Sequence, residues 1–99
     1  MAVLYVTEGK DIGGFGNFPI ASMAMPPIAE QTVAIGGASV QSGAFNPKTI
    51  FIRVHTDAIC SISFGANPTA SATTARMAAN TTEYFAVQSG HKIAVIANT

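Results

Sequence analysis

Turn-forming residues divide most of this chain into short segments about 8–12 residues apart, and these segments are rich in β-branched and aromatic side chains. In the clearest segment, 48–56, the side chains alternate as they do in a strand with one buried face. The two faces hold Ile50, Ile52 and Val54 on one side, and Phe51, Arg53 and His55 on the other. Helix signals are weak, and 71–80 is the only candidate helix. We therefore expect an all-β fold, a single antiparallel β-sandwich of about seven to nine strands with a jelly-roll-like topology.

The remaining strands are expected where similar short segments end at glycine, proline or asparagine. They cover residues 2–7, 31–35, 38–42, 59–64, 72–77, 83–87 and 91–97. The last two are predicted to form a hairpin, because Gly90 between them can supply the positive φ that short hairpin loops need. In the segment 59–64, the side chains expected to face the core are those of Cys60, Ile62 and Phe64.

Residues 9–29 differ from the rest of the chain. The stretch 13–19 is rich in glycine and phenylalanine, and Met25-Pro26-Pro27 interrupts any regular element, so that only 20–25 could form even a short helix or strand. Long irregular loops are uncommon in compact domains and are often functional. We therefore expect one domain, 1–99, from which an irregular segment extends (8–29) as an arm or long loop that lies on a neighbouring molecule. The candidate interface with that neighbouring molecule consists of Phe15, Phe18, Pro19, Met23, Met25, Pro26 and Pro27.

Charged residues are scarce: they make up only 10% of the chain, whereas ordinary soluble domains carry about 25%. A surface this poor in charge suits a protein that packs against other subunits, and the alternative is a small secreted or surface domain rich in alanine and threonine. The formal net charge is zero and the five cations are scattered, so we expect neither nucleic acid nor a membrane surface as a partner.

The chain offers few residues for a disulfide or for targeting. A single cysteine excludes an intrachain disulfide, and no apolar run approaches the length of about 20 residues that spans a bilayer. The N-terminal segment lacks the cationic start and the apolar run of a secretory signal. We expect a protein that is made and folded in a cytoplasm.

No group of side chains predicts catalysis or metal binding. A nucleophilic Cys60 with His55 as its base is conceivable from their spacing, but Cys60 falls on the apolar phase of its strand and is expected in the core. His55 and His91 lack a third metal ligand. Asp57 is expected to cap the turn after 48–56, and Arg53 could pair with Glu83 across two strands. We expect no enzymatic activity, no cofactor and no metal.

The second half of the chain resembles small structural proteins encoded by tailed bacteriophages. The resemblance covers mainly residues 45–97 and rests on framework residues of a β-sandwich rather than on a catalytic signature. Three stretches carry it: a strand and turn at Arg53-Val-His-Thr-Asp-Ala58, then Phe64-Gly-Ala-Asn-Pro-Thr-Ala70, and the closing run Glu83-Tyr-Phe-Ala-Val-Gln-Ser-Gly-His-Lys-Ile-Ala-Val-Ile96.

Some proteins of this type look like capsid cement or decoration proteins with small jelly-roll folds. The resemblance implies a non-enzymatic virion structural protein that binds the major capsid protein on the capsid surface and acts as a homo-oligomer, a dimer or a trimer. A tail or fibre domain is an alternative in the same setting. An alternative of another class is a small carbohydrate-binding module that uses Tyr5, Phe15, Phe18 or Tyr84 as stacking platforms, although such modules usually present tryptophan and this chain has none.

Overall fold

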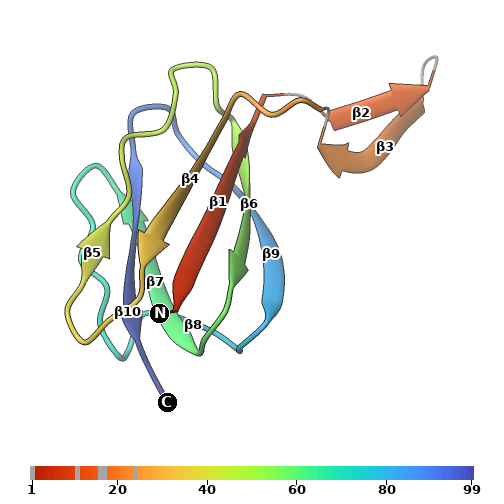
Figure 1. Cartoon of the computed structure of the whole chain (residues 1–99). Coiled ribbons are helices and arrows are strands. Elements are labelled where there is room, and N and C mark those ends of the chain that lie inside the picture. The colour runs from red at the N-terminus through yellow and green to blue at the C-terminus, as the bar shows by residue number, and fades with distance from the viewer. Residues whose placement is uncertain (1, 11, 16–17, 24) are drawn as a thin grey trace.

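The computed structural model describes residues 2–10, 12–15, 18–23 and 25–99, which form ten strands and no helix. Eight of the strands make two four-stranded antiparallel sheets that pack face to face (Figure 1). The first sheet contains, in spatial order, β4 (Ala29–Ala34), β1 (Val3–Gly9), β6 (Phe51–Thr56) and β9 (Thr81–Ala86). The second contains β5 (Val40–Gln41), β10 (Lys92–Ala97), β7 (Cys60–Gly65) and β8 (Ala75–Met77). This arrangement confirms the prediction of an all-β sandwich.

The core lies between the two sheets and follows the alternation seen in the sequence. In β1, Leu4 and Val6 face inward, and in β6 the same is true of Ile52 and Val54, so that all four are at most 1% exposed. The second sheet contributes Cys60, Ile62, Ile93 and Val95 to the same cluster. Phe64, also expected in the core, is 37% exposed and packs at its margin against Phe85, with the ring centroids 5.0 Å apart.

The outer faces of the two sheets differ. The loop 66–74 covers the outer face of the second sheet. As a result, Ser61 and Ala94 are fully buried although they point away from the core. Asn98 joins this cover to the sheet by donating hydrogen bonds from Nδ2 to Ser61 Oγ (2.6 Å) and to the carbonyl oxygen of Ala72 (3.2 Å). On the first sheet, Tyr5 and Tyr84 point outward and remain exposed, so its outer face is left open.

The expected irregular arm is instead a two-stranded antiparallel hairpin of β2 (Ile12–Phe15) and β3 (Phe18–Met23). It pairs with neither sheet and projects from one end of the sandwich, so that the molecule measures 46 × 25 × 22 Å (Figure 1). The glycine-rich composition that argued against a strand is accommodated because the two strands of the hairpin satisfy each other's backbone groups. We call residues 12–23 the arm.

The predicted hairpin of 83–87 and 91–97 is wrong. The turn exists, since Gly90 has a φ of 79° and the amide of His91 donates to the carbonyl oxygen of Gln88. However, β9 pairs with β6 in the first sheet, and β10 pairs with β7 and β5 in the second. A turn signal specifies local backbone geometry and not the partner strand, and here both strands bury apolar side chains in one core from opposite sides.

The candidate helix at 71–80 is absent, and the strand expected there is short. β8 covers only Ala75–Met77, where Met77 pairs with Cys60 and is buried. The strands expected at 38–42 and 48–56 also shorten, to β5 and β6. Ile50 therefore lies before β6 and is 57% exposed instead of facing the core.

Two expected side-chain interactions are replaced by others. In the turn after β6, the Thr56 hydroxyl donates to the carbonyl oxygen of Ala58 (2.6 Å) and accepts a hydrogen bond from the Ala58 amide (3.2 Å), the role expected of Asp57. Arg53 lies opposite Tyr84 in the register, while Glu83 lies opposite Val54. Because neighbouring residues of a strand point to opposite faces, Arg53 and Glu83 are on different sides of the sheet and do not pair. No helix in the described part of the chain is long and apolar enough to cross a membrane.

Candidate functional site: the arm and its root

Cys60 and His55, considered above as a nucleophile and its base, lie in different environments. Cys60 is buried in the core and donates a weak hydrogen bond to Thr56 Oγ1 (3.5 Å), whereas His55 points outward from the first sheet. Burial raises the pKa of the Cys60 thiol, the hydrogen bond with Thr56 partly lowers it, and the charge of Glu83 raises it further. The structure thus does not bring together a thiolate and a base at Cys60.

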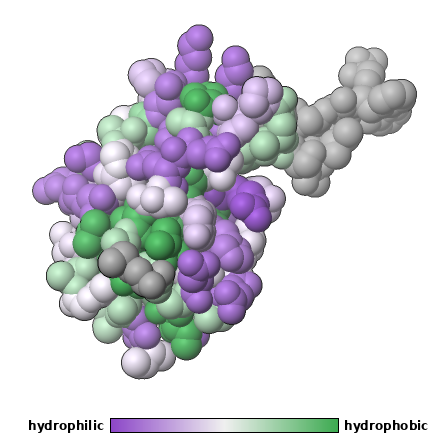
Figure 2. Space-filling view, viewed as in Figure 1, coloured by the Kyte–Doolittle hydropathy of each residue, from purple (hydrophilic) through white to green (hydrophobic). Residues whose placement is uncertain are grey.

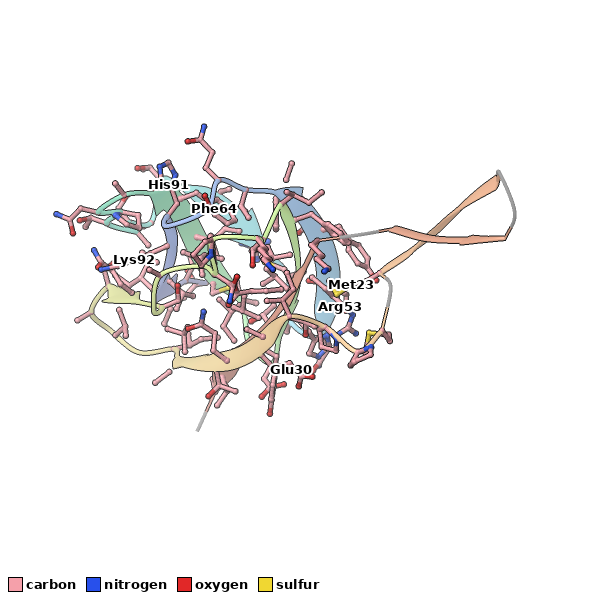
Figure 3. All side chains as sticks on the ribbon, turned by 90° about the horizontal axis from the view of Figure 1, so that it is seen from above. Met23, Glu30, Arg53, Phe64, His91 and Lys92 are labelled. Atoms are coloured by element: carbon pink, nitrogen blue, oxygen red, sulfur yellow. The ribbon has the colours of Figure 1, made fainter. Side chains whose placement is uncertain are left out.

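The two histidines are also separated. His91 lies beside Phe64 at a hollow of about 420 Å³ near the end of β7 (Figure 3). His55 lies in the first sheet, where it shares a hydrogen bond of 2.9 Å with Thr82 of the neighbouring strand β9. Among the residues that the structure describes, no three histidine, cysteine or acidic side chains are placed to hold a metal ion. The feature that stands out is the arm.

Main-chain hydrogen bonds fasten the arm where it leaves the sandwich. The amide of Ile28 donates to the carbonyl oxygen of Glu8 (2.9 Å), and the amide of Ile50 donates to that of Gly9 (3.0 Å). Ala29 pairs with Glu8 in the register of β4 and β1. The first and last residues of the predicted segment 9–29 therefore belong to the first sheet, and the projecting part is shorter than the sequence indicated.

A close contact between Met23 and Gly9 seats the base of the arm. A Cβ atom placed on Gly9 would lie only 2.8 Å from Met23 Cγ and 3.0 Å from Phe51 Cζ, so the Met23 side chain occupies the space that a larger residue at position 9 would fill. Figure 3 shows Met23 at this junction, on the side of the first sheet. A larger residue at position 9 would therefore have to displace the side chain of Met23 or Phe51.

A buried carboxylate lies beneath the junction. Glu8, in β1, is 2% exposed, and its Oε1 accepts hydrogen bonds from the amide of Asn46 (2.7 Å) and from Thr49 Oγ1 (2.8 Å). Its Oε2 accepts one from Gln31 Nε2 (3.2 Å), and Gln31 in turn accepts one from the amide of Gly43. These bonds tie the loop 42–50 to β1 and β4 and give the arm a rigid base.

Apolar side chains surround the junction and are accessible. Met25 is 70% exposed, Ile50 is 57% exposed and Pro26 is exposed, while Met23, Pro27 and Phe51 are half-buried. We call these six residues the root patch. Ile50 and Phe51 were not among the predicted interface residues, because an alternating segment assigned Ile50 to the core. The sequence feature that could have predicted them is that both faces of the segment 48–56 carry large apolar residues, so that one of these faces could not lie in the core.

The predicted interface residues thus lie in two places. Met23, Met25, Pro26 and Pro27 belong to the root patch, and Phe15, Phe18 and Pro19 belong to the arm. In the arm, Phe15 pairs with Phe18, and Gly14 pairs with Pro19. All seven therefore lie in one projecting structure and at its base.

Comparison of the chain with protein families, with curated proteins and with solved structures finds no match in any of the three. Function must therefore be argued from the chain itself. The features that bear on it are a low-charge sandwich, a projecting hairpin, and an apolar patch at its root.

Proposed function

We propose that this protein is a non-enzymatic structural component of a bacteriophage virion, a capsid cement or decoration protein that binds the assembled head through its arm and root patch. The observation that carries the proposal is a hairpin that projects from a rigid sandwich. From Ile12 to Ala29 the chain has no charged residue. The resemblance of residues 45–97 to phage structural proteins supports the same assignment.

The arm supports the proposal because a hairpin of this kind needs a partner. A two-stranded hairpin is marginally stable by itself in water, and this one pairs with neither sheet. Its strands offer main-chain hydrogen-bonding groups along their outer edges, which can pair with an extended segment of a neighbouring subunit. The root patch adds apolar area beside it. Together they suit a joint between subunits of a lattice.

The mechanism we infer is repeated weak binding. A shell presents the same joint many times, so that an oligomer of this protein, a dimer or a trimer, binds through several arms at once. If the joint is complete only in the mature shell, binding stabilises that state by mass action. The partner is the major capsid protein, and the location is the capsid surface of the virion.

Strand order supports the jelly-roll form of the sandwich. Between successive sandwich strands, only the β1–β4 and β7–β8 connections stay within one sheet, and the others cross from one sheet to the other. A jelly roll has the same spatial order of strands in both sheets, provided that the chain order is taken to run from β4 to β10 and to end with β1. We infer a rearranged jelly roll in which the first strand occupies the place of the last.

The proposal is tested by co-sedimentation of the purified protein with expanded, undecorated shells of the source phage, and with unexpanded shells. The key variant replaces residues 11–26 with an Asn-Gly turn, because Lys10 and Pro27 continue the paired register of β1 and β4 and can close on a two-residue turn. We expect saturable binding of the intact protein to expanded shells and no binding of the variant.

A matched control carries serine at Gly36 and Gly37, at the end of the sandwich away from the arm, where an added side chain meets nothing within 4 Å. This control should bind like the intact protein. Binding of the arm-replaced variant at full occupancy would show that the arm is not the docking element. If the intact protein binds neither kind of shell, the tail or fibre alternative replaces the head assignment.

A further inference from the structure

Two exposed tyrosines share the open outer face of the first sheet. Tyr5 in β1 is 44% exposed and Tyr84 in β9 is 58% exposed. Both alternate with inward-facing neighbours, so both rings point away from the core. Exposed aromatic rings on one flat face are more informative than single surface apolar residues, because together they can contact one extended ligand.

The strand register places the two rings at a defined separation. Tyr5 pairs with His55, and Tyr84 pairs with Arg53, both of which lie on β6 between the two tyrosines. Two strand spacings across the sheet and two residues along it put the Cα atoms about 12 Å apart. This separation is comparable with the repeat of two sugar units in an extended oligosaccharide.

A polar hollow lies beside the Tyr5 ring. Its volume is about 280 Å³, and its lining includes Tyr5, Thr7, Glu30 and Thr32. Within the described part of the chain, no hydrogen bond joins the hydroxyl of Thr7, the hydroxyl of Thr32 or the carboxylate of Glu30 to another group. These groups are therefore available to the hydroxyls of a ligand that stacks on Tyr5.

The charges of this face match an uncharged ligand. Thr7 pairs with Glu30 on β4 and with Arg53 on β6, so that one carboxylate and one guanidinium flank it in the same row of the sheet. Figure 3 shows Glu30 and Arg53 on the side of the molecule formed by the first sheet. Figure 2 shows polar residues over this side, below the grey arm. Because these two opposite charges balance, the row has no net positive charge that would attract an anionic polymer such as a nucleic acid.

We propose that the outer face of β4, β1, β6 and β9 binds a neutral oligosaccharide. Tyr5 and Tyr84 stack on two sugar rings, and Thr7, Glu30, Thr32 and Arg53 bind hydroxyl groups. This activity is independent of the arm. The other sheet cannot serve in the same way, because the loop 66–74 covers it. A virion protein with this site would hold a neutral glycan on its open face while the arm holds the shell.

The test is isothermal titration calorimetry of the full chain with cellohexaose, xylohexaose, mannohexaose and chitohexaose. We expect at least one of them to bind with a Kd below about 1 mM, an affinity that corresponds to about −4 kcal/mol. The double variant Tyr5→Ala/Tyr84→Ala should bind that sugar at least tenfold more weakly. The double variant Tyr5→Phe/Tyr84→Phe keeps both rings and should stay within about threefold of the intact protein.

Val40→Ala is the matched control, since Val40 is an exposed apolar residue of the second sheet (39% exposed). It should not change sugar binding, and thermal unfolding shows whether each variant is folded. The proposal is overturned if none of the four sugars binds, or if the alanine double variant, folded, retains its affinity. Shell binding is measured in parallel. The arm-replaced variant should still bind the sugar, and the Tyr5→Ala/Tyr84→Ala variant should still bind expanded shells. If the tyrosine variant loses the shell, the face is a shell contact and the glycan assignment fails.

Discussion

At the scale of single residues, the buried carboxylate of Glu8 ties together segments that are distant along the chain. Among the charged residues whose burial is described, it alone is enclosed, and its neighbours are neutral hydrogen-bond donors. Burying a carboxylate is costly unless its oxygens are bonded, so the three donors must be held in place around it. This requirement fixes the loop 42–50 against the end of β1, where the arm begins.

Glu8→Ala should therefore destabilise the protein by about 3 kcal/mol, because it removes the acceptor and leaves the Asn46 amide and the Thr49 hydroxyl buried without partners. Glu8→Gln keeps one oxygen for these two donors and should cost about half as much. Urea unfolding followed by circular dichroism measures both. A loss below about 0.5 kcal/mol for Glu8→Ala would show that the donors find other partners or water.

Residues of the core could be predicted from the sequence, and residues of the turns and the root could not. Cys60 and Ile62 lie in the core as expected, because strand alternation sets which face a side chain takes. Nothing in the sequence distinguished Thr56 from Asp57 as the residue that caps the turn, since both side chains can bond the nearby backbone. The burial of Glu8 depends on donors at positions 31, 46 and 49, which are distant along the chain.

At the scale of elements, a tight contact joins the arm to the sandwich. Met23, the last residue of β3, lies over Gly9, the last residue of β1, and touches the region of Phe51. The contact sets where the hairpin begins, since β1 and β3 approach each other there without hydrogen-bonded pairing. Position 9 is therefore a place where a larger side chain would disturb both the base of the arm and the first sheet.

We expect Gly9→Ala to destabilise the protein by about 1–2 kcal/mol, because the added methyl group would overlap the Met23 side chain. In a Met23→Ala background, the same change should cost much less, since the space is then vacant. A double-mutant cycle by chemical denaturation measures the difference as a coupling energy of at least about 0.5 kcal/mol. Additive losses in the cycle would show that Met23 does not seat the arm.

The pairing of elements was less predictable than their existence. The alternation in 83–87 and 91–97 indicated two strands correctly, and the turn at Gly90 is present, yet the strands belong to different sheets. In the arm, the composition of 13–19 indicated a loop, whereas the backbone forms a paired hairpin. The partner of a strand depends on which apolar faces can be buried together, and the sequence of one segment does not predict this.

At the scale of the whole molecule, the low charge content and the arm point to the same kind of association. The sandwich has one sheet covered by its own loop, one open face, and an uncharged projection beyond both. Contacts made by such a projection are apolar or between backbone groups, which salt screens little. The association we propose therefore differs in its salt response from binding through ion pairs.

Binding of the protein to expanded shells should change less than about twofold in affinity between about 0.05 M and about 0.5 M NaCl, because the segment from Ile12 to Ala29 contributes no ion pair. Co-sedimentation over this range measures it, and any charge-driven binding would weaken steeply over the same range. A loss of tenfold or more would locate the contact at the scattered charged residues of the sandwich instead of the arm.

The sequence by itself determined the class of fold, the inward face of the central strands and the position of an unusual segment near the N-terminus. These follow from local rules, since alternation, turn residues and composition act over a few positions. Only the tertiary structure decided which strands pair, that the arm is a hairpin seated on Gly9, and that Tyr5 and Tyr84 share one open face. These depend on the burial of distant segments in one core, where each sheet supplies half of the apolar surface that neither can bury alone.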